Sequence, residues 1–200
     1  ADDVAAVIAG RDMEELQRKL NQVMLSTKEW LDSHGLKLAT EKTELVLITK
    51  KHIPLNIEMR VLSETICTQS SVKYLGLRLD PRLNFTSQLE ASTAKAAKIS
   101  SNLSRLMANI GGPTESKRRL LMSTTQSILL YGAEIWGDAV RKECRRKLLA
   151  KVQRTAALRV SSAYRTVSEQ AILVISSTIP IDLLIEMRKT IWVHINNTQN

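Results

Sequence analysis

The chain has 200 residues, of which 44% are hydrophobic and 24% charged, and it carries a net charge of +9. This composition is typical of a folded protein and excludes an intrinsically disordered or collagen-like chain. No apolar run approaches the roughly 18 residues of a membrane span, and no basic signal-peptide segment opens the sequence. Cys67 and Cys144 have no metal-type spacing to each other or to the three histidines, so neither a zinc module nor a disulfide scaffold is expected. We therefore expect an intracellular protein that is not secreted and has no membrane partner.

Charge is distributed unevenly along the chain. Residues 1–72 hold 9 Lys/Arg against 11 Asp/Glu, residues 73–140 hold 9 against 5, and residues 141–200 hold 11 against 4. A basic C-terminal two thirds favours a polyanionic partner, usually nucleic acid. The alternative is a set of solvated surface lysines and arginines.

The first predicted elements are a short strand and a helix. Residues 4–9 are almost wholly apolar, which predicts a strand that is buried on both faces. Asp12 and Glu15 have the spacing of a capping box, and apolar residues follow at helical intervals until Gly35, where we expect the helix to end. Strands are then predicted over residues 36–38, 44–49, 55–59, 61–67 and 72–80.

From about residue 85 the pattern is nearly all helical. The first helix, 92–110, has one apolar stripe, made of Ile99, Leu103, Leu106, Met107 and Ile110. A break at 111–113 precedes further helices predicted over 114–130, 138–160, 166–176 and 181–195. The sequence therefore predicts an α+β fold, with an α/β part over residues 1–81 and an all-helical part over residues 82–200.

Two adjacent carboxylates, Asp2 and Asp3, stand at the start of the predicted strand. Two neighbouring carboxylates repel each other and raise each other's pKa, unless a cation or the N–H groups of a turn offset the repulsion. Magnesium would compensate, because it takes carboxylate oxygens together with substrate phosphates in two-metal phosphoryl transfer. An Asx-type turn that satisfies both acids locally is the alternative.

Four segments carry a resemblance to a known family, and they follow in this order: ADDVAAVIAG, WLDSHGLKLATEKTELVLITKK, VKYLGLRLDPRLNF and ILLYGAEIWG. Together they resemble the reverse transcriptase of non-LTR (LINE-type) retrotransposons, an RNA-directed DNA polymerase, over nearly the whole chain. The resemblance implies that residues 1–81 are part of a polymerase palm, with a βαβ unit and antiparallel hairpins, and that residues 82–200 are the thumb and connection. It implies an RNA template and a DNA primer as partners, deoxynucleoside triphosphates in the complete enzyme, and a nuclear or cytoplasmic ribonucleoprotein.

The resemblance also implies catalytic residues. Ala1-Asp2-Asp3 is similar to the end of an aromatic-Ala-Asp-Asp box, so Asp2, and more weakly Asp3, would bind the two Mg²⁺ ions. Lys42 matches a loop lysine that would approach the triphosphate and protonate the leaving pyrophosphate; an exposed lysine between two strands is the alternative. A further metal-binding Asp and the residues that hold the nucleotide would precede Ala1. We therefore expect an incomplete metal site and a fragment that is inactive alone.

Tyr74-Leu75-Gly76 resembles the primer-grip box of these polymerases. Gly76 has no side chain and would let a nucleic-acid backbone approach the strand closely, although a glycine at a bulge is the alternative. The alternation around it predicts a hairpin with Leu75, Leu77 and Leu79 packed inward and Lys73 and Arg78 in solvent. Beside the primer grip, we expect Lys73 to contact the nucleic acid.

Two helical segments carry basic faces. In the first, five residues fall within an arc of about 80° on an ideal helix: Lys95, Lys98, Asn102, Arg105 and Asn109. In the second, Lys147, Lys151 and Arg154 share a face opposite Leu148, Leu149, Val152 and Ala156. Such faces can bind successive phosphates of a template–primer duplex without sequence readout, and solvated amphipathic helices are the alternative.

Three hypotheses follow from the sequence. The first is a palm and thumb piece of a reverse transcriptase. The second is a non-catalytic basic helical module that binds RNA or DNA. The third is a structural helical protein without a nucleic-acid role.

Overall fold

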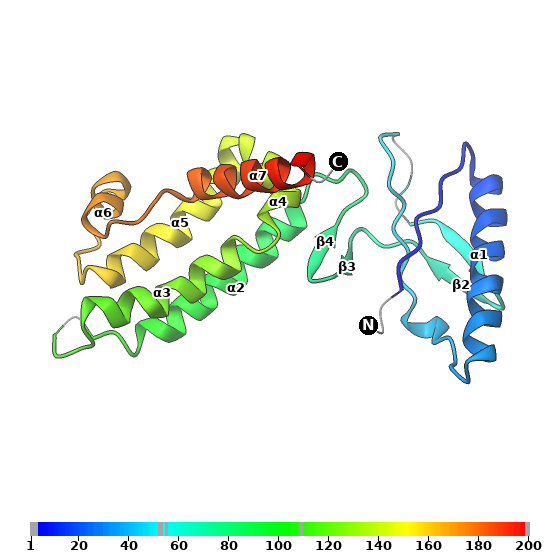
Figure 1. Cartoon of the computed structure of the whole chain (residues 1–200), viewed down its shortest axis with the longest axis horizontal. Coiled ribbons are helices and arrows are strands. Elements are labelled where there is room, and N and C mark those ends of the chain that lie inside the picture. Colours follow the sequence, from blue (N-terminus) through cyan, green and yellow to red (C-terminus); the bar gives the residue numbers. More distant parts are fainter. Residues whose placement is uncertain (1–3, 52–53, 55, 109, 199–200) are drawn as a thin grey trace. The chain divides into compact units, whose positions relative to one another are not determined.

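The structure, a computed structural model, describes residues 4–51, 54, 56–108 and 110–198. The chain divides into two compact units, residues 1–83 and 84–200. The first unit contains helix α1 (Met13–Ser33), the 3₁₀ helix η1 (Thr40–Lys42) and strands β1 (Glu58–Val61), β2 (Glu64–Cys67), β3 (Val72–Tyr74) and β4 (Leu77–Leu79). The second contains α2 (Thr86–Ser104), α3 (Glu115–Leu129), α4 (Ala133–Trp136), the 3₁₀ helix η2 (Gly137–Arg141), α5 (Glu143–Val160), α6 (Glu169–Ile175) and α7 (Ile181–Thr198). The fold is thus mixed α+β and mostly helical (Figure 1).

Helix α1 is confirmed with both of its predicted ends. The Asp12 side chain accepts a hydrogen bond from the N–H of Glu15 at 2.8 Å, and the Glu15 carboxylate accepts one from the N–H of Arg11 at 2.8 Å. The Arg11 N–H and then the Lys19 ammonium hold the pKa of Glu15 below its ordinary value. After His34, Gly35 adopts a φ of +71°, a left-handed conformation that favours glycine and ends the helix.

The four strands form two antiparallel hairpins, β1–β2 and β3–β4, each a separate two-stranded sheet. One face of α1 covers β1, because Leu20 and Met24 are buried together with Met59 and Val61. No βαβ unit is present in the described part of the chain.

The strand predicted over residues 4–9 is wrong. These residues pair with no strand in the part of the chain that the structure describes. Val4 and Val7 are 77% and 96% exposed, although the half-buried Ile8 packs against the α1–β1 cluster. Nor do residues 36–38 and 44–49 form strands, although the carbonyl of Leu45 accepts a hydrogen bond from the N–H of Gln69 at 2.8 Å. A strand needs a partner for its backbone groups along its length, and an apolar run cannot specify that partner.

In the second unit, α2, α3 and α5 pack against one another, while α7 packs against α4 and η2 (Figure 1). The predicted helices over 114–130, 166–176 and 181–195 correspond to α3, α6 and α7. The helix predicted over 138–160 is divided between η2 and α5. The helix predicted over 92–110 starts earlier and ends at Ser104, which leaves Leu106 and Ile110 of its predicted apolar stripe exposed.

A buried arginine fixes the turn between α2 and α3. The Arg118 guanidinium donates hydrogen bonds to four carbonyl oxygens, those of Met107, Ala108, Pro113 and Arg159. A Cβ on Gly112 would lie 2.0 Å from the Ala108 carbonyl oxygen, so this position requires glycine. Because Arg159 is in the last turn of α5, the network ties the chain after α2 to the end of α5.

Candidate nucleic-acid interface

The predicted metal ligands, Asp2 and Asp3, lie outside the described residues. Among the residues that the structure does describe, no group of three His, Cys, Asp or Glu side chains could hold a metal ion. The magnesium site therefore stays a prediction.

Lys42 lies at the end of η1 with its side chain exposed. Its backbone N–H donates to the carbonyl of Ala39 at 3.1 Å, and the Thr40 hydroxyl donates to the Glu64 carboxylate on β2 at 2.7 Å. The short helix that carries Lys42 is thus tied to the first hairpin. A lysine held this way can present its ammonium to solvent or to a phosphate, and its catalytic role stays a prediction.

The Tyr74-Leu75-Gly76 segment makes the turn of the second hairpin. Tyr74 pairs with Leu77, so Leu75 and Gly76 are the two turn residues, and their φ values are +45° and +83°. A two-residue turn of type I′ requires a positive φ at both positions, which explains Gly76 without a bulge. The primer-grip role of the segment is not tested by this geometry.

The prediction of which side chains of this hairpin are buried and which are exposed is partly wrong. Leu77 is buried and Leu79 half-buried, while Lys73 and Arg78, which pair across the strands, are exposed as predicted. Leu75 was predicted to pack inward but is 63% exposed, because it occupies the turn, where the alternation of a strand no longer applies.

The second unit contains a groove of about 670 Å³ between α2 and α5. Small side chains line it on the α2 side, among them Ala94, Ala97, Ser101 and Ser104. Three cations line it as well: Arg105 directly after α2, and Lys151 and Arg159 of α5. Glu90 is the acidic residue of the lining. The groove therefore has an excess of positive charge, which suits an anionic ligand.

The two helices meet at their C-terminal ends, where Leu103 and Met107 pack with Ala156 and Val160. This arrangement places Arg105 and Arg159 near the same end of the groove. Cations at helix C-termini also stabilise the helix dipoles, so a structural role for these two arginines is the competing explanation. Among the described residues, however, no hydrogen bond or ion pair engages the side chains of Arg105, Lys151 or Arg159.

Other predicted phosphate ligands are engaged elsewhere. Lys147 pairs with Glu143 at 2.7 Å, and the hydrogen bond from this ammonium lowers the pKa of the Glu143 carboxyl. Arg154 donates to the carbonyl oxygens of Arg165 and Val167 at 2.7 and 2.6 Å. The structure thus brings together Arg105 and Lys151 from the two predicted basic faces.

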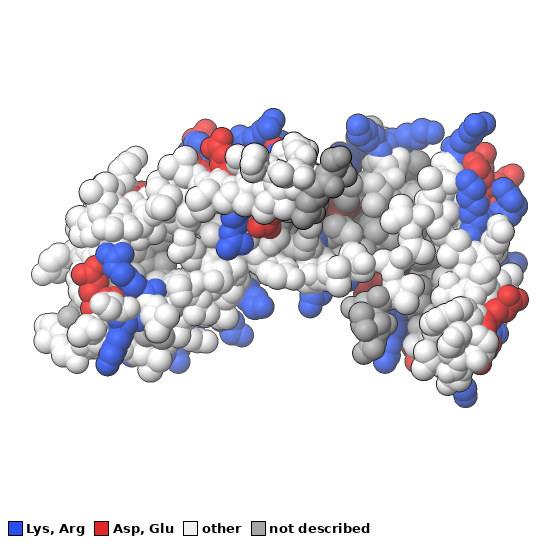
Figure 2. Space-filling model, viewed as in Figure 1, with Lys and Arg blue, Asp and Glu red and all other residues white. Residues whose placement is uncertain are grey.

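The remaining predicted ligands lie outside the groove, and one groove cation was missed. Three residues of the first predicted face, Lys95, Lys98 and Asn102, are exposed on α2 but do not line the groove, and Asn109 lies outside the described residues. Arg159 was not predicted, although it follows Lys151 and Thr155 at steps of four along one helix face. On the face shown in Figure 2, the lysines and arginines of the second unit stand singly or in small groups, without forming a continuous basic surface.

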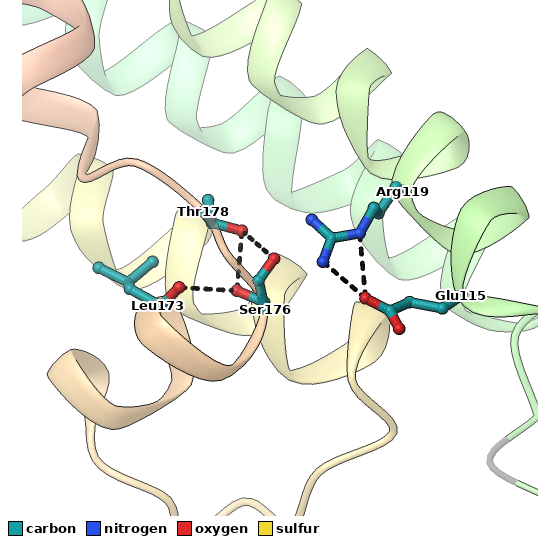
Figure 3. A network of polar contacts seen from close by, with 5 residues as sticks. All are labelled: Glu115, Arg119, Leu173, Ser176 and Thr178. Carbon is teal, nitrogen blue, oxygen red and sulfur yellow. Dashed lines mark hydrogen bonds and ion pairs between the residues drawn. The ribbon is translucent and has the colours of Figure 1, made fainter.

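A second hollow, of about 230 Å³, lies between α3, α5 and the segment before α7. Its charged lining residue, Arg119, is paired with Glu115 at 2.6 Å (Figure 3). Nearby, the Ser176 hydroxyl donates to the hydroxyl of Thr178 at 2.8 Å, which braces the turn between α6 and α7 (Figure 3). Because its cation is already neutralised, this hollow is less suited to a polyanion than the α2–α5 groove.

Comparison with known proteins finds distant relatives of one kind. The chain is 27% identical over 190 residues to the Retrovirus-related Pol polyprotein from type-1 retrotransposable element R1 2 of Nasonia vitripennis, covering 92% of this chain and 46% of that protein. It is 26% identical over 195 residues to a second such polyprotein, from element R1 of the same species, covering 92% of this chain and 56% of that protein. It is 29% identical over 152 residues to the Probable RNA-directed DNA polymerase from transposon BS of Drosophila melanogaster, covering 73% of this chain and 16% of that protein.

These matches define a distant relationship. The chain is related, at 26–29% identity and over most of its length, to Pol polyproteins and reverse transcriptases of the non-LTR elements R1 and BS. It spans about half the length of the first two relatives. No family model matches the chain, and no solved structure matches it. Within the described part, no helix is both long and apolar enough to cross a membrane.

Proposed function

We propose that the chain is part of the reverse transcriptase of a non-LTR retrotransposon, and that residues 84–200 hold the RNA–DNA template–primer through its phosphates. The observation that carries this proposal is the α2–α5 groove, where Arg105, Lys151 and Arg159 converge from two helices. The distant relationship to an RNA-directed DNA polymerase supports the choice of ligand.

The chemistry of the groove cations suits this task. A polymerase must hold every sequence that it copies, so its duplex contacts have to go to the sugar–phosphate backbone and not to base edges. The guanidinium of an arginine can donate two parallel hydrogen bonds to one phosphate, and the ammonium of Lys151 acts as a point charge. Each neutralised phosphate releases counterions, which makes the binding both tight and dependent on salt.

For the chemical step, we assign Asp2 and Asp3 to Mg²⁺ binding and Lys42 to protonation of the leaving pyrophosphate. Carboxylate oxygens are the ligands that Mg²⁺ prefers. Two carboxylates that are adjacent in the sequence are fewer than a two-metal site requires, and the described residues add no cluster to them. The proposal therefore places nucleotidyl transfer in a longer polyprotein of the kind that the relatives represent, with this chain as its duplex-holding part, in an intracellular ribonucleoprotein.

The test is binding of RNA–DNA duplexes to the purified 200-residue chain, followed by fluorescence anisotropy at physiological salt. We expect duplexes of unrelated sequence to bind alike and more tightly than about 10⁻⁴ M, the weak end of non-specific binding. The triple variant Arg105→Gln, Lys151→Gln, Arg159→Gln should weaken binding by at least tenfold, since each lost charged hydrogen bond removes about 1.5–3 kcal/mol.

A charge-matched control separates this effect from the loss of net charge. Lys117, Lys142 and Arg146 are exposed in the same unit and do not line the groove. Changing all three to Gln should reduce affinity only slightly. Equal weakening by the two triple variants would contradict the proposed interface, and absence of duplex binding would remove the nucleic-acid role of residues 84–200.

A further inference from the structure

The α2–α5 groove is lined by small side chains along part of α2, a feature that binding of an anion does not by itself explain. On the α2 side three exposed lining positions after Glu90 are small: Ala94, Ala97 and Ser101. A solvent-facing helix usually carries long polar side chains at such positions. The lack of long side chains at these three positions leaves space beside this stretch of α2, so that another backbone can lie close to the helix.

A buried hydroxyl in the lining lacks a partner. Ser100 is 1% exposed and lines the groove, and its Oγ is a buried polar atom without a hydrogen bond among the described residues. Most buried polar groups in proteins are hydrogen-bonded, because leaving one unpaired is costly. An oxygen-rich ligand in the groove would supply the missing partner.

The size of the groove limits what can occupy it. Its volume of about 670 Å³ is in the range of small-ligand pockets and admits a few linked sugar–phosphate units. A base-paired duplex is too wide to enter such a space and could only rest on its rim. The cations Arg105, Lys151 and Arg159 favour an anionic occupant, and the small side chains favour a slender one.

We infer that a single sugar–phosphate strand of nucleic acid lies lengthwise in the α2–α5 groove, with its sugars against Ala94, Ala97 and Ser101 and its phosphates at the three cations. The inference rests on the proposed function for the identity of the polyanion. It goes further in placing one strand inside the groove, where the proposed function requires only phosphate contacts. Ser100 donates its hydroxyl proton to an oxygen of that strand.

The test fills the groove without changing its charge. Ala97→Leu adds bulk inside it, whereas Thr124→Leu adds a leucine at an exposed position of α3, outside the lining and outside both predicted basic faces. With a labelled 12-nucleotide single-stranded RNA and the full 200-residue chain, Ala97→Leu should weaken binding at least tenfold and Thr124→Leu less than twofold. Ala94→Leu is a second groove-filling variant with the same expectation, and thermal unfolding verifies that each variant is folded.

Ser100→Ala provides a readout that a purely structural serine would not give. Because its hydroxyl has no partner among the described residues, this variant should keep or raise the melting temperature. Loss of one neutral hydrogen bond to the strand should weaken RNA binding by about threefold to tenfold. A fall in melting temperature with unchanged RNA affinity would overturn the assignment of Ser100.

The outcomes distinguish this inference from the proposed function. If Ala97→Leu and Ala94→Leu bind the single strand as the unmodified chain does, while the triple charge variant loses RNA–DNA duplex binding, the inference falls and the proposed function stands. If neither single strand nor duplex binds, both fall. Competition by poly-glutamate as effective as that by RNA of equal charge would also overturn the inference, since the groove would then accept an acidic peptide.

Discussion

Arg154 of α5 donates a hydrogen bond to the carbonyl oxygen of Val167 at 2.6 Å, across 13 residues of chain. A second hydrogen bond from the same guanidinium nitrogen reaches the carbonyl of Arg165 at 2.7 Å. These contacts fasten the loop between α5 and α6 to the helix that precedes it. Arg154 therefore stabilises the fold, whereas Lys151, one turn earlier, lines the groove.

We predict that Arg154→Gln lowers the free energy of unfolding by about 1–3 kcal/mol, because two backbone carbonyls lose a charged donor. Urea denaturation measures this change. Arg146→Gln, an exposed arginine of the same helix, is the control and should stay within about 0.5 kcal/mol of the unmodified chain. A destabilisation no larger than that of the control would show that the loop is held by other contacts.

Gln153 anchors the segment before α7. Its side-chain amide donates to the carbonyl of Ile179 at 2.8 Å and accepts from the N–H of Ile181 at 2.9 Å, and the residue is buried. Gln153→Leu should cost at least about 2 kcal/mol of unfolding free energy, because both backbone groups lose their partner and the hydrogen bond from the Ile181 N–H is buried. Gln153→Glu, which keeps the acceptor and loses the donor, should be destabilising as well. A leucine variant as stable as the parent chain would contradict this role.

The contact between η2 and α7 should contribute less to stability at acid pH. Lys189 donates to the Asp138 carboxylate and, with the charge of Arg141, holds the pKa of that carboxyl below its ordinary value of 3.8. A carboxyl whose pKa is lowered by folding stabilises the fold above its unfolded pKa, and this contribution is lost as the pH falls through the folded pKa. The effect is small because the group is exposed.

Thermal unfolding between neutral pH and pH 2 checks this expectation. Asp138→Asn should lower the melting temperature slightly at neutral pH and converge with the parent chain at the acid end. A constant difference between the two proteins over the whole range would mean that ionisation of Asp138 does not contribute.

Lys42 can be tested once a longer, active polymerase that contains this chain is prepared. Lys42→Ala should slow the chemical step with little change in template–primer affinity, because protonation of a leaving group acts in the transition state. Lys37→Ala, an exposed lysine shortly before η1, is the control. If only affinity fell, Lys42 would be a backbone-positioning residue. The 200-residue chain alone should show no RNA-templated incorporation of nucleotides. Measurable incorporation would refute the prediction that its metal site is incomplete.

Local chemistry made part of this fold predictable. The N-terminus of α1 follows from Asp12 and Glu15 alone, because a capping interaction joins residues within one turn. The strand predicted at residues 4–9 failed because strand pairing depends on distant residues that an apolar run does not identify. Leu75 was misassigned because a two-residue turn interrupts the alternation of the hairpin.

For the candidate interface, the sequence predicts which basic residues share a helix face, but not which partners they contact. The helical pattern places three basic residues of α5 on one face, but their contacts differ. Lys147 pairs with Glu143, Lys151 lines the groove and Arg154 binds loop carbonyls. The carbonyl oxygens that engage Arg154 belong to a loop that follows α5, and no helical pattern indicates their position. Arg159 lies in the same groove as Lys151 because α2 packs along that side of α5.

The most direct test of the central claim is the salt dependence of RNA–DNA duplex binding by the purified chain. If the groove cations contact phosphates, the logarithm of the binding constant should fall linearly with the logarithm of salt concentration, with a slope of about 0.7–0.9 per phosphate neutralised. Lys151→Gln should reduce that slope by about one contact and weaken all sequences alike, whereas Arg154→Gln should leave the slope unchanged. A slope that does not change in Lys151→Gln, or that falls equally in Arg154→Gln, would contradict the account.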